Sequence, residues 1–270
     1  MSTASDDVLL AAGERYIARR KNPHGLRFRN PDMRRSSKLG LRPLAEIAEA
    51  ALLCFTQRGY RLTQMSDVGA ELDMSPTAAY RYVESKEALF HISALHAAGI
   101  PLDDLPLPVV VEDLAATVES VAAIVRSWPR WPVLRKALAQ RSPARDPRRE
   151  AEDVATELYD FLAGKWRVIV LFDRTANDIP SLKTAFAEEY RAPYLSDIVA
   201  WFGKRSGKPG GDLSTEALAR GGIEAISWLA MRRRTDPAAR AIAESQARHA
   251  AARSLAALLR DARDVPGRDG

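Results

Sequence analysis

The 270-residue sequence has a single cysteine, Cys54, and no apolar run long enough to span a membrane. One cysteine excludes an intramolecular disulfide and a thiolate-based zinc site. The apolar surroundings of Cys54 favour a buried small hydrophobe, with a redox sensor as the alternative. The chain starts with polar and acidic residues, so no secretory signal is expected. A cytoplasmic protein without a membrane partner is predicted.

The residue patterns of common enzymes are also missing. The four histidines are scattered, and His91 and His96 are too far out of helical phase to share one face. There is no glycine-rich phosphate loop and no nucleophile elbow. The sequence therefore predicts no catalytic residue, no metal and no cofactor, and a helical enzyme is the weakest alternative.

The segment Gly59 to Leu89 is the most informative part of the sequence. Met65, Val68 and Leu72 recur at helical spacing, which predicts a first short helix that opens at residue 63 or 64. The two-residue link that follows forces a steep crossing of two helices, and Asp73 tolerates the left-handed backbone that such a turn needs. This is the pattern of a helix-turn-helix motif.

A second helix is predicted to begin at Ser75 or Pro76, because serine caps a helix and proline fits its first position. Ala79 and Val83 are expected to face inward. Small residues at the helix start allow close approach to base edges, while tyrosine and lysine suit phosphates. Packing at the core boundary is the alternative for the tyrosines. The predicted DNA contacts in and near the motif are Thr63, Ser66, Ser75, Pro76, Thr77, Ala78, Tyr80, Arg81, Tyr82 and Lys86.

Residues 42 to 90 resemble the DNA-binding domain of the TetR family of bacterial transcriptional regulators, most specifically in the run from Tyr80 to Glu87. The resemblance implies an all-α protein, with an N-terminal three-helix helix-turn-helix domain and a larger C-terminal helical domain for ligand binding and dimerisation. It implies a repressor that binds a palindromic operator as a dimer and is released by a small molecule. The chain departs from the family at Asp73, usually glycine, and at Ala79, usually larger.

The segment before the motif is strongly basic. From Arg15 to Arg42 it holds ten lysines or arginines and one acidic residue, a local charge of about +9 in a chain of net charge +5. We interpret it as a basic arm that lies along DNA, with Arg34, Arg35 and Lys38 as contacts. A solvated tail is the alternative.

Beyond residue 98, helical patterns alternate with proline and glycine breaks. Three prolines between Gly99 and Pro108 indicate a linker, and the strand-like run from Trp166 to Phe172 is interpreted as helix because no second run could pair with it. The predicted helices are 111–127, 131–140, 148–174, 181–205, 214–234 and 237–262. The predicted domains are an arm (1–40), a DNA-binding head (41–98), a linker (99–110), a regulatory and dimerisation body (111–263) and a tail (264–270).

Three partners are predicted. The first is double-stranded operator DNA; the alternative function is that of a non-selective architectural protein, which would bind DNA of any sequence. A second copy of the chain is expected to pack on small residues around Gly221 and Gly222 and along 238–257, although ordinary packing within one chain is the alternative. The third is an unidentified small-molecule effector. Most aromatic residues of the body must form core, and the predicted effector contacts are Trp128, Trp166, Phe172 and Tyr190.

Overall fold

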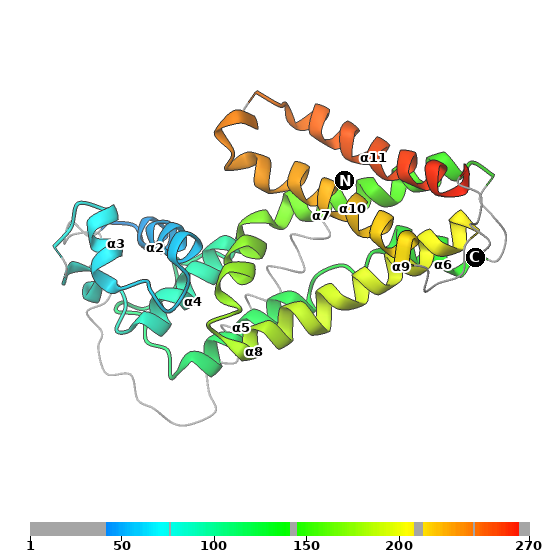
Figure 1. Ribbon diagram of the computed structural model, residues 1–270. Coiled ribbons are helices and arrows are strands. Elements are labelled where there is room, and N and C mark those ends of the chain that lie inside the picture. The colour runs from blue at the N-terminus through cyan, green and yellow to red at the C-terminus, as the bar shows by residue number, and fades with distance from the viewer. Residues whose placement is uncertain (1–41, 76, 141–144, 208–212, 240, 265–270) are drawn as a thin grey trace. The chain divides into compact units, whose positions relative to one another are not determined.

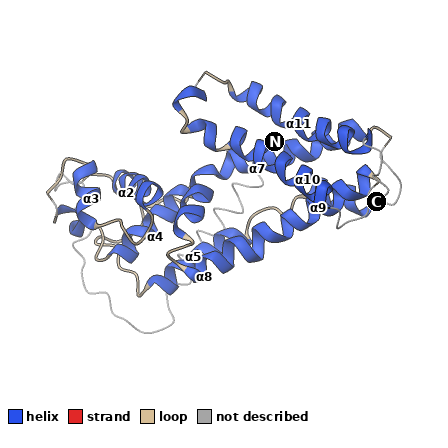
Figure 2. Ribbon diagram, viewed as in Figure 1, coloured by secondary structure: helices blue, strands red, loops and turns tan. Residues whose placement is uncertain are grey.

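The computed structural model of the protein describes residues 42–75, 77–140, 145–207, 213–239 and 241–264. Within these ranges every regular element is helical (Figure 2), apart from one isolated backbone bridge between Val83 and Val109. The prediction of an all-α fold is therefore confirmed. The basic arm, with Arg34, Arg35 and Lys38, lies outside the described residues, and so does Pro76. No described helix is both long enough and apolar enough to cross a membrane.

The chain divides into two compact units. Unit 1 consists of Met1–Trp128 with Arg167–Ala187, and unit 2 consists of Pro129–Trp166 with Glu188–Gly270. The long helix α7 (Pro147–Thr175) contributes its C-terminal end to unit 1 and the rest to unit 2. The sequence assigns the whole of this helix to the body, whereas its last turns group with the head.

Unit 1 has an aromatic core beneath its DNA-binding motif. Phe55 and Phe90 meet edge to face with ring centroids 5.3 Å apart, and Tyr60 lies within 5.8 Å of both. Ile47, Ala51 and Phe55 are wholly buried and four residues apart, so they form one face of their helix. The described helices of unit 1, besides the end of α7, are α2 (Leu44–Arg58), α3 (Met65–Glu71), η2 (Ala78–Arg81), α4 (Lys86–Ala97), α5 (Leu114–Arg126) and α8 (Pro180–Lys183).

Unit 2 is built around α9, α10 and α11, which pack against one another. Figure 1 shows α10 and α11 running side by side. Gly222 makes this close approach possible, because a Cβ there would lie 2.8 Å from Leu255 Cδ1. The remaining described helices are α6 (Pro132–Ala139), η3 (Thr184–Arg191), α9 (Ala192–Ser206), α10 (Leu213–Ala230), η4 (Arg232–Arg234), η5 (Pro237–Ala239) and α11 (Glu244–Asp264).

Two helices differ from their predicted form. The helix predicted over 181–205 contains the π-helical segment η3. Pro193 has no N–H to donate to the carbonyl of Glu189, which interrupts the α-helical ladder, and Arg130 Nη1 lies 3.4 Å from that carbonyl oxygen. The last helix begins at Glu244 rather than 237. Arg233 donates to the carbonyl of Ile242 at 3.1 Å, which stabilises a loop where a helix was expected.

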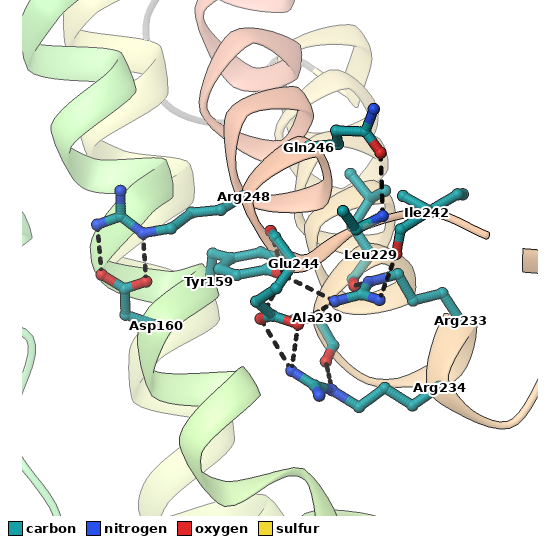
Figure 3. A network of polar contacts seen from close by, with 11 residues as sticks. Tyr159, Asp160, Leu229, Ala230, Arg233, Arg234, Ile242, Glu244, Gln246 and Arg248 are labelled. Carbon is teal, nitrogen blue, oxygen red and sulfur yellow. Dashed lines mark hydrogen bonds and ion pairs between the residues drawn. The ribbon is translucent and has the colours of Figure 1, made fainter. Parts of the chain in front are cut away.

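A polar network fixes that loop to α7 (Figure 3). Glu244, the first residue of α11, accepts hydrogen bonds from Tyr159 at 2.7 Å and from Arg234 at 2.9 Å, and it also pairs with Arg233. One turn further along α11, Arg248 binds both carboxylate oxygens of Asp160 at 2.7 Å. Arg233 and Arg234, in the α10–α11 connection, therefore share a carboxylate partner inside unit 2.

Candidate nucleic-acid interface

The turn that follows α3 is the predicted helix-turn-helix turn. The Met74 N–H donates to the Gly69 carbonyl at 2.8 Å, and the Asp73 N–H lies 3.3 Å from the Ala70 carbonyl oxygen. Asp73 has a left-handed backbone with φ +52°. This is the Schellman arrangement, in which the residue with the left-handed backbone is usually glycine. The prediction that Asp73 supplies the left-handed residue is confirmed.

The recognition segment, residues 75–83, is less helical than predicted. Among its described residues only Ala78–Arg81 is helical, as a single 3-10 turn, whereas the sequence predicts a helix from Ser75 or Pro76. The reason lies at its far end. The Val109 N–H donates to the Tyr82 carbonyl at 2.7 Å, and the Glu84 N–H donates to the Val109 carbonyl at 3.0 Å. These bonds form the isolated bridge between Val83 and Val109, which ends the helical turn, so the predicted linker is in fact paired with the motif.

The outer face of the recognition segment carries most of the predicted DNA contacts. Ala79 and Val83 are buried, as expected, and they anchor the segment in the head. Tyr80 is 52 % exposed, so its aromatic ring is not part of the core. The predicted contacts that lie exposed are Ser66, Ser75, Thr77, Tyr80 and Arg81, and Ala78 is partly exposed.

Thr63 and Tyr82 are corrections to the predicted interface. The Thr63 side chain is wholly buried, and its hydroxyl donates to the Gly59 carbonyl at 2.7 Å, which closes the turn after α2. Tyr82 is also buried, and its hydroxyl accepts a hydrogen bond from the Arg42 N–H at 2.9 Å. Both side chains stabilise the head from inside, so we withdraw them from the interface.

Lys86, the predicted phosphate anchor, has partners within the protein. Its Nζ donates to the Arg61 carbonyl at 3.0 Å and lies 4.6 Å from the centroid of the Tyr60 ring. Burial lowers the pKa of Lys86, and the nearby carboxylates of Glu87 and Asp178 oppose that shift. Lys86 would have to leave these partners to bind a phosphate. Sequence reasoning could not find them, because one is a backbone carbonyl.

The four predicted effector contacts are divided between the two units. In unit 1, Trp128 and Phe172 both pack against Phe186, with centroid distances of 6.1 and 5.8 Å. In unit 2, Tyr190 packs against other rings, and Trp166 is partly exposed on α7.

The Tyr190 group is a closed aromatic cluster. The Tyr190 ring lies 5.0 Å from Trp131 and 5.7 Å from Phe161, and its hydroxyl donates to the Pro129 carbonyl at 2.8 Å. Burial raises the pKa of Tyr190. Trp131, which precedes a proline, has a positive φ of +33°, a strained conformation for a bulky residue.

No group of three or more histidine, cysteine or acidic side chains is placed to hold a metal ion in the described part of the chain. Cys54 is buried, and burial raises the pKa of its thiol, which disfavours the reactive thiolate. These observations fit a small hydrophobe at that position better than a redox sensor.

The three short helices, the left-handed turn and the exposed polar face define a helix-turn-helix DNA-binding head on an all-helical protein. Residues 47–91 match the family model described as bacterial regulatory proteins, tetR family. The resemblance of the head to the DNA-binding domain of this family, seen in the sequence, is therefore confirmed.

Two solved structures are similar to this chain over most of its length. One is a protein from Mesorhizobium loti assigned to the TetR family, with 19% identity and a TM-score of 0.40 over 81% of this chain and 95% of that chain. The other is a TetR-family transcriptional regulator from Streptomyces coelicolor, with 14% identity and a TM-score of 0.36 over 88% of this chain and 98% of that chain. No curated protein matches the sequence.

Proposed function

We propose that this protein is a cytoplasmic, nucleoid-associated transcriptional repressor that binds a palindromic operator as a homodimer and is released by a small-molecule ligand. The exposed face of the recognition segment carries this proposal. It presents the hydroxyls of Ser75, Thr77 and Tyr80 together with the guanidinium of Arg81. These groups donate hydrogen bonds to base edges and phosphate oxygens, which is how a helix-turn-helix motif reads a major groove.

Selection of bound duplexes from a random DNA pool tests the DNA-binding part. We expect one palindromic consensus whose half-sites are about 34–36 Å apart, one turn of the double helix. Thr77→Ala should change the preferred base at one position, because Thr77 is exposed on the face that is proposed to meet the base edges. A flat distribution of recovered sequences would instead support a non-selective architectural DNA-binding protein.

The homodimer is proposed to form on α10 and α11. Ala217, Gly221, Ala225 and Trp228 are exposed along one side of α10, and Trp228 is 37 % exposed. A Cβ on Gly221 would meet no described atom within 4 Å. A smooth stripe of small residues ending in a tryptophan is suited to close packing against a second helix pair across a two-fold axis.

The effector is proposed to bind in unit 1, at the cluster of Trp128, Phe172 and Phe186. Thr117 is buried on α5, about three helical turns before Trp128, and its Oγ1 has no hydrogen-bond partner among the described residues. A buried hydroxyl without a partner is costly unless a ligand satisfies it. This supports a largely apolar effector with one hydrogen-bonding group. Trp166 and Tyr190, which belong to unit 2, are not part of this proposed site and stay predictions.

Tryptophan fluorescence titrations with a panel of apolar, aromatic and cationic compounds test the effector site. A bound compound should quench the wild-type signal, and the Trp128→Phe variant should lose most of that change. Thr117→Val, which keeps the side-chain shape, should weaken only compounds with a hydrogen-bonding group. If no compound alters fluorescence or DNA affinity, the repressor is controlled in another way.

A further inference from the structure

Both backbone polar groups of Arg61, the N–H and the carbonyl, form hydrogen bonds with side chains. Its N–H donates to Asp178 Oδ2 at 3.0 Å, and its carbonyl accepts a hydrogen bond from Lys86 Nζ at 3.0 Å. Asp178 follows the end of α7, whereas Lys86 is the first residue of α4. The Arg61 backbone therefore connects the end of α7 to Lys86, the predicted phosphate anchor.

The Asp178 side of this connection is closely fitted. Gly59 has a φ of +84°, and a Cβ there would lie 3.0 Å from Asp178 Oδ2. Only glycine lets the turn after α2 rest on this carboxylate without strain. A second contact lies nearby, because Arg174 Nη2 donates to the Gln57 carbonyl at 3.1 Å. The end of α7 thus holds the exit of α2 at two points.

The Lys86 ammonium group also has two contacts within the head. It is taken up by the Arg61 carbonyl and by the face of the Tyr60 ring, and Tyr60 is fixed by a 3.0 Å hydrogen bond from its hydroxyl to Glu87. In this position the side chain is folded back onto the surface of the head, and its ammonium group stays exposed. An ammonium group has three N–H donors, and reaching outward to a phosphate would give up the contacts with the carbonyl and the ring.

We propose that Asp178 is a regulatory contact that holds Lys86 away from DNA, so that the arrangement seen here is the state of low DNA affinity. This rests on the proposed function. An effector that binds the held state more tightly than the released state must weaken DNA binding by the same factor. Phe172 lies on α7 six residues before Asp178, so an effector at the Phe172 cluster acts on the same helix end.

The competing explanation is simple charge. Asp178 adds a negative charge near the predicted interface, and any such charge lowers the affinity for DNA. Two substitutions separate the explanations. Asp178→Asn removes the charge but keeps an oxygen that can accept from the Arg61 N–H, whereas Asp178→Ala removes both.

The test measures affinity of the full-length protein for a 30-base-pair random-sequence duplex across a salt series, after thermal unfolding shows that each variant is folded. Asp178→Ala should bind about threefold tighter or more, with a slope of log K against log salt steeper by about 0.9, as one added phosphate contact requires. Asp178→Asn should show a smaller increase in affinity and in salt slope than Asp178→Ala. In a Lys86→Ala background, Asp178→Ala should leave the slope unaltered.

Equal effects of Asp178→Ala and Asp178→Asn would overturn the proposal in favour of charge alone. So would an effect of Asp178→Ala that persists without Lys86. If wild type binds and Asp178→Ala behaves like it, only the regulatory contact is refuted. If neither wild type nor any variant binds DNA, the proposed function fails, and this inference fails with it.

Discussion

The two units use their basic side chains differently. In unit 2, arginines that link neighbouring helices bind carboxylates, as in Arg205 with Glu150, Arg233 with Glu244 and Arg248 with Asp160. Unit 1 also has such pairs, as in Arg58 with Asp67 and Arg167 with Glu49, but Arg81 is exposed on the recognition segment, and Lys86 contacts an uncharged carbonyl and a ring. The difference lies in the motif itself, where these two basic side chains have uncharged surroundings, whereas the basic side chains that link helices in unit 2 have carboxylate partners.

The largest change in stability is expected at the Arg205–Glu150 pair of unit 2. Its side chains are only 3% and 11% exposed, and Arg205 Nε lies 2.5 Å from Glu150 Oε1. Glu150→Gln leaves a buried guanidinium without its counter-charge, so the free energy of unfolding should fall by about 3–5 kcal/mol in chemical denaturation. The matched control is Glu152→Gln. Its partner Arg148 is largely exposed, and the loss should be about 0–1 kcal/mol. Equal losses would contradict the structural role assigned to the buried pair.

The same pair predicts a pH dependence. Burial raises the pKa of Glu150, but hydrogen bonds from Arg205 and Trp201 outweigh burial, and the folded pKa is lowered. A carboxylate with a lowered folded pKa stabilises the fold above its unfolded pKa of about 4.3, and that stabilisation is lost as the pH falls through the folded value. The gap in melting temperature between wild type and Glu150→Gln should therefore be constant near neutral pH and narrow below about pH 4. A gap that widens in acid would refute this assignment.

In unit 1 the stability is expected to depend on the backbone conformation of Gly59. Gly59 combines a φ of +84° with a ψ of 172°, a region that is essentially restricted to glycine. Gly59→Ala should reduce the free energy of unfolding by about 1–3 kcal/mol. Gly164→Ala is the control, because a Cβ at this helical position meets no described atom within 4 Å, and it should stabilise the protein by up to about 1 kcal/mol. Similar stability of both variants would show that the turn after α2 can rearrange.

The dimer gives a test confined to unit 2. Gly221→Leu places a bulky side chain on the exposed stripe of α10, where the monomer has room for it. Sedimentation should show a dimer dissociation constant raised at least about tenfold with an unchanged melting temperature of the monomer, as expected for a clash confined to the interface. Gly164→Leu, at another exposed helical glycine, should leave the dimer intact. An unaffected Gly221→Leu dimer would place the interface elsewhere.

The smallest expected effect is at the turn of the motif. Asp73 occupies a left-handed position with φ +52°, where a Cβ is unfavourable. Asp73→Gly should raise the free energy of unfolding by about 0.5 kcal/mol, since the relief of strain exceeds the added flexibility of the unfolded chain only slightly. Asp73→Val, which tolerates this conformation poorly, should be destabilised in the same denaturation experiment.

Local patterns in the sequence predicted the parts of the head that local forces determine. The periodicity of Met65 and Val68 gave α3, and the inward positions of Ala79 and Val83 followed from their spacing. The left-handed Asp73 followed from the two-residue link. These features depend on neighbours within one or two turns of helix, so the sequence contains the necessary information.

Features that depend on distant backbone atoms were not predictable. Val109 shortens the recognition helix through bonds to residues 82 and 84, and no local pattern marks such a pair. Thr63 is predicted to contact DNA, yet its hydroxyl donates to the carbonyls of Cys54 and Gly59, in α2 and at its end. Lys86 likewise has a carbonyl partner. A backbone carbonyl is present at every residue, so the sequence gives no sign of which one a side chain will choose.

The central claim, that two heads read DNA as a two-fold pair, is tested most directly with the duplex recovered by selection. Affinity is measured for that duplex and for one with five base pairs inserted between its half-sites, which rotates them by about half a turn. A dimer with two recognition segments should lose about 100-fold or more in affinity, because only one half-site can then be engaged. Equal affinity for the two duplexes would contradict the claim.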